Sequence, residues 1–222
     1  MLVLSSTISD YEKILTTKRT TRTMNKYLGF YELKSLNIPT VRWERFTYDT
    51  ELDGSKLWTI RVAVEKSKDL NLPRLIGANA EEAGKKGREL LDMFSDRGMV
   101  VFYPYFIAEK SGVLEINNTR TVIEAVEKDL WNLVTFGIKN VTMVYPNSKN
   151  SSNVFFHGDR EFLSGEEVDE LRKFSSIIRG TYRDELSEGR SILAEWSYAY
   201  DTDVSRKPEG DRYLVFFELR GL

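Results

Sequence analysis

The last sixty residues of the chain constrain its fold most, because one helical pattern there is followed by two long strand patterns. The helical pattern is LSGEEVDELRKFSSIIRGTY, residues 163–182, and the strand patterns are ILAEWSYAYD, residues 192–201, and YLVFFELRGL, residues 213–222. The chain therefore ends in a predicted helix and a predicted strand hairpin.

Three charged residues stand inside these two strand patterns. Glu195 has apolar neighbours on both sides, and Glu218 and Arg220 lie two positions apart on the closing strand. Residues two apart on a strand point to the same face, so one face of the hairpin presents an acid and a base. Carboxylates on adjacent strands suit Mg²⁺ with a polyphosphate, because Mg²⁺ takes one or two carboxylates and leaves its other positions to water and phosphate. We therefore predict a metal site at Glu195 and Glu218.

Composition limits the possible functions. The 222 residues are 41% hydrophobic, which is enough for one large domain or two lobes with a real core. With 32 basic and 34 acidic residues, the chain has no net positive charge that would attract nucleic acid or anionic lipid, so we expect neither as a partner. The absence of cysteine excludes disulfides, thiolate nucleophiles and cysteine-bound zinc. No apolar run approaches the roughly 18 residues of a membrane span, and no signal peptide is evident, so we expect a cytoplasmic protein.

The remaining patterns alternate between helices and strands along the chain. We expect helices over 26–36 and 80–94, and strands over 40–46, 57–66, 99–107, 112–116, 121–127, 130–137 and 140–146. Residues 69–77 and 147–153 have loop composition, and Lys110 to Gly112 has turn chemistry. The single His157 is expected to be structural, and the basic cluster Lys18, Arg19 and Arg22 to be solvated.

Several weak motifs occur in an order that resembles a known family. They are Lys26 followed by LGFYELKSLNIPTV, IRVAV with Arg61, KDLNLPRLIGANAEEA, YPYFIAEKSGVLEI, EAVEKDLWNLVTFG, the helical pattern at 163–182, EWS at Glu195, and ELRG at Glu218. In this order they resemble the nucleotide-binding domain of phosphoenolpyruvate synthase and pyruvate phosphate dikinase, which is of the ATP-grasp class. The resemblance extends from about Lys26 to Leu222.

The resemblance implies an α+β, ATP-grasp-like fold with two lobes of mainly antiparallel sheet and helices, residues 1–97 and 98–222. It also implies a site for ATP and Mg²⁺ in the cleft between the lobes. It implies that Lys26 and Arg61 hold phosphates, that Arg220 holds the distal phosphate, and that Glu195 and Glu218 hold Mg²⁺. Arg61 and Arg220 would also act on the transferring phosphoryl group, because guanidinium groups stay charged and bind phosphate oxygens two at a time. The resemblance further places Gly77 in a phosphate loop, Tyr105 and Ile107 beside the adenine, and Asn132 where the family has a carboxylate.

The family likeness predicts a Mg²⁺-dependent, ATP-binding phosphotransferase-like protein that phosphorylates a separate acceptor, for example a phosphohistidine-domain protein. Two departures leave alternatives open: the loop at Gly77 lacks the family's run of small residues, and Glu218 replaces a glutamine. One alternative is a degenerate ATP-grasp domain that acts as a regulatory or scaffolding partner, and another is an ATP-grasp carboxylate ligase. The charged residues would also suit structural ion pairs. The four tryptophans are expected to be core or interface anchors.

Overall fold

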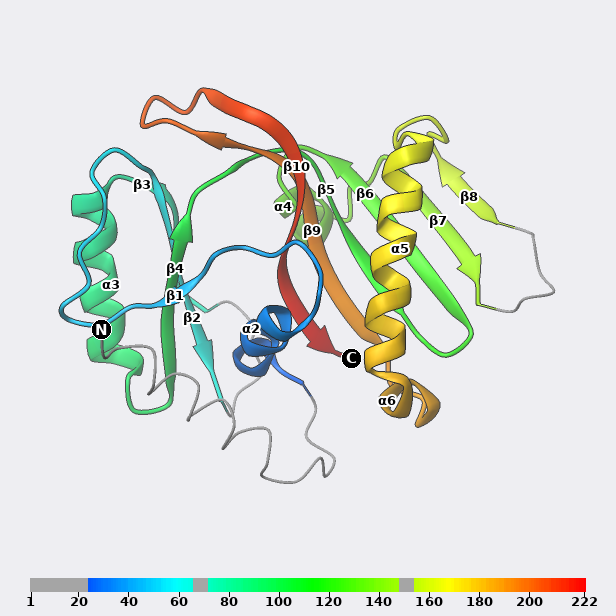
Figure 1. Ribbon diagram of the computed structural model, residues 1–222, viewed down its shortest axis with the longest axis horizontal. Coiled ribbons are helices and arrows are strands. Elements are labelled where there is room, and N and C mark those ends of the chain that lie inside the picture. The colour runs from blue at the N-terminus through cyan, green and yellow to red at the C-terminus, as the bar shows by residue number, and fades with distance from the viewer. Residues whose placement is uncertain (1–23, 66–71, 148–153) are drawn as a thin grey trace.

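The computed structural model describes residues 24–65, 72–147 and 154–222 and has a mixed α+β architecture (Figure 1). Its two sheets are mostly antiparallel: a four-stranded sheet of order β1-β4-β2-β3 and a six-stranded sheet of order β10-β9-β5-β6-β7-β8. The α+β prediction is therefore confirmed. The basic cluster at Lys18, Arg19 and Arg22 and most of the predicted loop at 147–153 lie outside the described residues.

The smaller sheet carries one long helix on one face. Its strands are β1 (Glu44–Arg45), β2 (Trp58–Val64), β3 (Arg74–Ala78) and β4 (Gly98–Pro104), and the helix is α3 (Ala80–Phe94). Apolar residues of α3, β2 and β4 form the core between helix and sheet, with Leu90, Ile60 and Val100 fully buried. Every residue of β2 is buried, because the second face of this strand is covered as well.

The larger sheet packs its own helix against one face (Figure 1). Its strands are β5 (Ile107–Ile116), β6 (Arg120–Glu127), β7 (Val141–Pro146), β8 (Phe155–Gly158), β9 (Ile192–Thr202) and β10 (Pro208–Gly221). Helix α5 (Gly165–Thr181) starts at a capping box made by Ser164 and Glu167 and is followed by the short α6 (Arg183–Ser187). Leu171 and Phe174 of α5 pack on Trp196 and Phe216 of the sheet.

Helix α2 (Lys26–Ser35) joins the two sheets. Its N-cap Asn25 accepts a hydrogen bond from Leu28 N at 3.1 Å and donates one to Glu65 O, just beyond β2, at 2.7 Å. At Gly29 the helix lies so close to β10 that an added Cβ would overlap the carbonyl of Leu219. These contacts fix the first turn of α2, and with it Lys26, between β2 and β10.

The chain passes from the smaller to the larger sheet between Pro104 and Ile107. The predicted lobe boundary at 97/98 lies just before β4, and β4 pairs with β2 over its whole length. The smaller sheet therefore extends past the predicted boundary, as far as Pro104.

Two strand predictions were wrong. Residues 130–137 form the helix α4 (Trp131–Phe136) instead of a strand, because Asp129 accepts a hydrogen bond from Trp131 N at 2.7 Å and Gly137 ends the turn in the left-handed region at φ 66°. The predicted strand at 40–46 is reduced to β1, with one isolated bridge from Thr40 to Phe216.

Two loop predictions also failed in part. Arg74 to Gly77, placed in a loop, belong to β3, which pairs with β2. Lys110 to Gly112, predicted as a turn, lie inside β5, where Ser111 pairs with Val126 on one side and Ser197 on the other. Gly112 is needed in this strand because a Cβ there would overlap the Trp196 ring and the Glu124 carbonyl.

Candidate functional site

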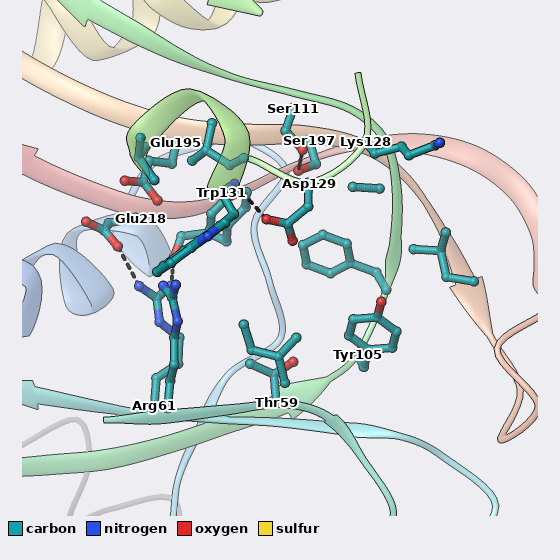
Figure 2. A pocket seen from close by; sticks show the side chains of 18 of the residues that line it. Thr59, Arg61, Tyr105, Ser111, Lys128, Asp129, Trp131, Glu195, Ser197 and Glu218 are labelled. Atoms are coloured by element: carbon teal, nitrogen blue, oxygen red, sulfur yellow. Dashed lines mark hydrogen bonds and ion pairs between the residues drawn. The ribbon is translucent and has the colours of Figure 1, made fainter. Parts of the chain in front are cut away.

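A cavity of about 1140 Å³ lies between the two sheets. Its walls come from β2, β3 and β4 of the smaller sheet, from β5, β6, β9 and β10 of the larger sheet, and from α2 and α4. Figure 2 shows that Arg61 and Thr59 enter the cavity from the smaller sheet, whereas Glu195, Glu218, Ser111 and Ser197 enter from the larger one. The cavity is therefore formed where the two sheets face each other.

A β-bulge in β10 brings the two predicted acids into register. Phe216 pairs with Trp196, but Glu218 pairs with Glu195, so Phe217 is one extra residue in β10. Such a bulge shifts the alternation of side chains along the bulged strand. Phe216 and Leu219 therefore both enter the core beneath the sheet, while Glu218 faces the cavity beside Glu195.

Glu218 is the centre of a buried ion-pair cluster. Its Oε2 lies 2.5 Å from Nη2 of Arg61, and its Oε1 lies 3.3 Å from Nζ of Lys26 and 3.9 Å from Nε of Arg220. The Glu218 side chain is only 3% exposed. Burial by itself would raise the pKa of Glu218, but Arg61 and Lys26 hold it below its ordinary value.

Glu195 has a different electrostatic environment from Glu218, although the two residues are direct partners on adjacent strands. Within the described residues it makes no hydrogen bond and no ion pair. Burial, and then the negative charge of Glu218, raise the pKa of Glu195 from 4.5 to about 7. The cluster thus contains three cations, Lys26, Arg61 and Arg220, and only one fully ionised acid, Glu218, because the pKa of Glu195 is near neutral. Its net charge is therefore positive.

Most of the sequence-predicted residues meet in this cavity. Lys26, Arg61, Glu195, Glu218 and Arg220 form the charged end, and Tyr105 and Ile107 line the same cavity where the chain passes between the sheets. A structural ion-pair role for the charged residues, which the sequence left open, accounts for Arg61, Lys26 and Glu218, but gives Glu195 no partner.

Gly77 and Asn132 are not among the lining residues. Gly77 is buried in β3 with φ 65°, and its carbonyl accepts a hydrogen bond from Arg206 Nη2 at 3.0 Å. Asn132 is exposed, and its carbonyl accepts the backbone N–H of Gly137 at the end of α4. Contact between these two residues and a nucleotide stays a prediction.

The donor set fits Mg²⁺ better than a metal held by protein alone. Among the described residues there is no group of three or more acidic or histidine side chains that could hold a metal ion. His157 is exposed on β8 and does not line the cavity. The pair Glu195 and Glu218 matches Mg²⁺, which binds through one or two carboxylates plus phosphate and water.

Sequence reasoning missed three groups of the cavity wall. Trp131, assigned to the core or an interface, is 47% exposed and lines the cavity, with the guanidinium of Arg74 at 4.7 Å from the centre of its ring. Ser111 and Ser197 share a hydrogen bond of 2.8 Å across two strands. Ser197 could have been found as a polar residue inside a strand pattern. Ser111 was hidden by the wrong turn prediction at 110–112, and Trp131 by the wrong strand prediction at 130–137.

Comparison of the chain with protein-family models and with curated proteins gave no match. In the part of the chain that the structure describes, no helix is both long and apolar enough to cross a membrane.

Proposed function

We propose that the cavity binds ATP with Mg²⁺ and that the protein is a phosphotransferase-like component of the ATP-grasp class, which transfers a phosphoryl group to a separate acceptor. The observation that carries the proposal is the meeting of Lys26, Arg61, Glu195, Glu218 and Arg220 at one end of the cavity between the sheets. These five residues come from α2, β2, β9 and β10, and they are the residues for which the family resemblance implies phosphate and metal binding.

The electrostatics of the cluster support an anionic ligand. Burial alone would lower the pKa of Arg61, but Tyr103, Glu218 and Glu195 raise it, so the guanidinium stays charged in the cavity wall. A buried guanidinium that faces a cavity binds phosphate oxygens strongly, because water screens the attraction little there. A polyphosphate would replace Glu218 as the partner of Arg61 and Lys26, and this exchange would free the Glu218 carboxylate.

Glu195 and Glu218 would hold the Mg²⁺ ion. When bound, Mg²⁺ neutralises charge that develops on the transferring phosphoryl oxygens. The side chains then have separate tasks: Lys26, Arg61 and Arg220 bind and orient phosphate oxygens, and Glu195 and Glu218 hold the metal ion. Phosphoryl transfer requires little more from a protein than this positioning and charge stabilisation.

A second candidate is a domain that binds a nucleotide without turnover and serves as a regulatory or scaffolding partner. The positions of Gly77 and Asn132 favour it, because both lie outside the cavity lining although the family resemblance expects them to contact the nucleotide. The two candidates share the ligand and differ in whether the γ-phosphoryl group leaves.

Calorimetric titration of ATP and of a non-hydrolysable analogue, with and without Mg²⁺, tests the site. The wild type should bind both nucleotides more tightly with Mg²⁺, and Glu195→Ala should lose the metal dependence. Glu166→Gln is a matched control, because Glu166 is an exposed acid on α5 outside the cavity. Absence of binding at millimolar ATP would refute the proposal. Binding without phosphate release or isotope exchange, in the presence of candidate acceptors, would favour the second candidate.

A further inference from the structure

Trp131 differs from the other three tryptophans of the chain. Trp43, Trp58 and Trp196 are buried in the core, as expected for large aromatic side chains, but Trp131 is 47% exposed. Figure 2 shows its indole within the pocket, between Asp129 and the pair of Arg61 and Glu218 in that view. An aromatic ring left this open inside a cavity has surface available for a ligand.

The backbone below Trp131 is fixed, so the ring is held at the cavity wall. Asp129 caps Trp131 N, and the buried side chains of Leu130 and Leu133 anchor α4 against Val113 and Val126 of the larger sheet. Val134, one helical turn further, also faces the cavity. Helix α4 therefore presents an apolar face to the cavity while its other side is part of a core.

The opposite wall is also apolar and open. Leu72, Pro73 and Ile76 line the cavity from β3 and the residues just before it, and Ile76 is 44% exposed. Arg74, on the same strand, places its planar guanidinium over the Trp131 ring. The space above the indole is therefore wide enough for a flat group. Because Arg74 is exposed, its guanidinium can move into solvent and a ligand ring can take its position with little loss of stability.

From this geometry we propose that Trp131 is the stacking surface for the planar, aromatic ring of the cavity's ligand, so that the ligand class is a nucleotide with its base against α4 and its phosphates at Arg61. This inference rests on the proposed function. In place of Tyr105 and Ile107, which the family resemblance puts beside the adenine, it makes Trp131 the residue that decides affinity for the base. The base would stack on the indole in place of Arg74 or on the indole face that Arg74 leaves open. Stacking of this kind tolerates different bases, because every base has a flat π-face.

Titration of two probes separates the base from the phosphates: ATP and inorganic tripolyphosphate, both with Mg²⁺. Trp131→Ala should weaken ATP binding by about tenfold or more and leave tripolyphosphate binding unchanged. Trp131→Phe, which keeps a flat ring, should bind ATP within about threefold of the wild type. Phe136→Ala is the control, because Phe136 is a 64% exposed aromatic residue of the same helix that does not line the cavity.

Intrinsic fluorescence provides a second readout, because Trp131 is the tryptophan that a cavity ligand can touch. ATP should change the emission of the wild type, and this change should vanish in Trp131→Phe although that variant still binds. Unchanged ATP affinity in Trp131→Ala, or an equal loss for ATP and tripolyphosphate, would overturn the inference and leave the proposed function standing. If the wild type binds neither probe, the proposed function fails as well.

Discussion

Glu195 and Glu218 show how strongly the position of a residue, rather than its type, sets its chemistry. Both are glutamates on adjacent strands, and their backbones are direct partners in the sheet. Glu218 is held ionised by Arg61 and Lys26, whereas Glu195 has no ion-pair partner and faces the charge of its neighbour. Of the two, Glu195 is therefore the carboxylate whose pKa is raised toward neutral pH.

Removal of Arg61 should be costly. Arg61→Ala leaves the buried Glu218 carboxylate without its nearest cation, and loss of one partner of a buried ion pair costs about 3 kcal/mol of folding stability or more. The double variant Arg61→Ala, Glu218→Gln should cost less than the sum of Arg61→Ala and Glu218→Gln, because each single variant leaves one charge of the buried pair without the other. Urea unfolding at neutral pH measures the stability of these variants. Arg88→Ala, at an exposed position, is the control and should stay within about 0.5 kcal/mol of the wild type. Strictly additive costs in the double variant would contradict the ion-pair interpretation.

The raised pKa of Glu195 predicts a pH-dependent stability of definite sign. The folded protein keeps a proton on Glu195 up to about pH 7, whereas the unfolded chain releases it near 4.5. The folded state therefore binds more protons in this window, and the free energy of unfolding falls as pH rises, by at most about 1.4 kcal/mol per pH unit. We expect this slope in the difference between wild type and Glu195→Gln, which cancels the groups that do not interact with Glu195. A flat difference would show that Glu195 titrates normally, and a difference that rises with pH would show that folding lowers its pKa; either result would contradict the prediction.

At the scale of elements, the packing of α2 on β10 determines where Lys26 lies. Gly29 permits this packing, since a Cβ at this position would overlap the Leu219 carbonyl. Gly180 is a second helical glycine, near the end of α5, and an added Cβ there meets nothing within 4 Å. The two glycines therefore form a matched pair with opposite expectations.

Gly29→Ala should lower the free energy of unfolding by about 2 kcal/mol, because α2 must move away from β10. Gly180→Ala should raise it by about 0.5 to 1 kcal/mol, because alanine restricts the unfolded chain and favours the helix. Urea unfolding curves of the two variants and the wild type provide the comparison. Gly29→Ala should also weaken ATP binding, since Lys26 moves with the helix; equal stability of both variants would show that α2 packs more loosely on β10.

Elements with a long, regular pattern could be predicted from the sequence, and elements set by tertiary contacts could not. The helices at 80–94 and 163–182 and the final hairpin have clear periodicity, and the structure has α3, α5, β9 and β10 there. Helix α4 is an exception: it was predicted as a strand because WNLVTF is rich in strand-forming residues, although two local signals favour the helix, the hydrogen bond from Trp131 N to Asp129 and the left-handed Gly137. The bulge at Phe217 and the Trp131–Arg74 contact depend on partners far along the chain, so no local pattern contains them.

At the scale of the whole molecule, the two sheets are joined by a shared core and not only by the linking chain. A cluster of buried residues combines Phe30 and Tyr31 of α2, Met99 and Val101 of the smaller sheet, and Val215 of β10. The ion pair between Arg61 of the smaller sheet and Glu218 of the larger one lies beside it. An interface with a buried apolar core favours unfolding of both sheets in one step.

Two core variants test whether the molecule unfolds as one unit. Leu90→Ala creates a cavity in the core of the smaller sheet, and Leu171→Ala creates one in the core of the larger sheet. Because both leucines are fully buried, each variant should lose about 2 to 5 kcal/mol of folding stability. If the sheets unfold together, each variant shifts the whole urea transition to a lower midpoint with an unchanged slope, followed by circular dichroism and by tryptophan fluorescence alike. Hydrogen exchange should then show that the slowest amides of β2 and of β9 are destabilised by the same amount in each variant. Two separate transitions, with each variant moving only one, would mean that the lobes are independent and that the cavity between them can open without global unfolding.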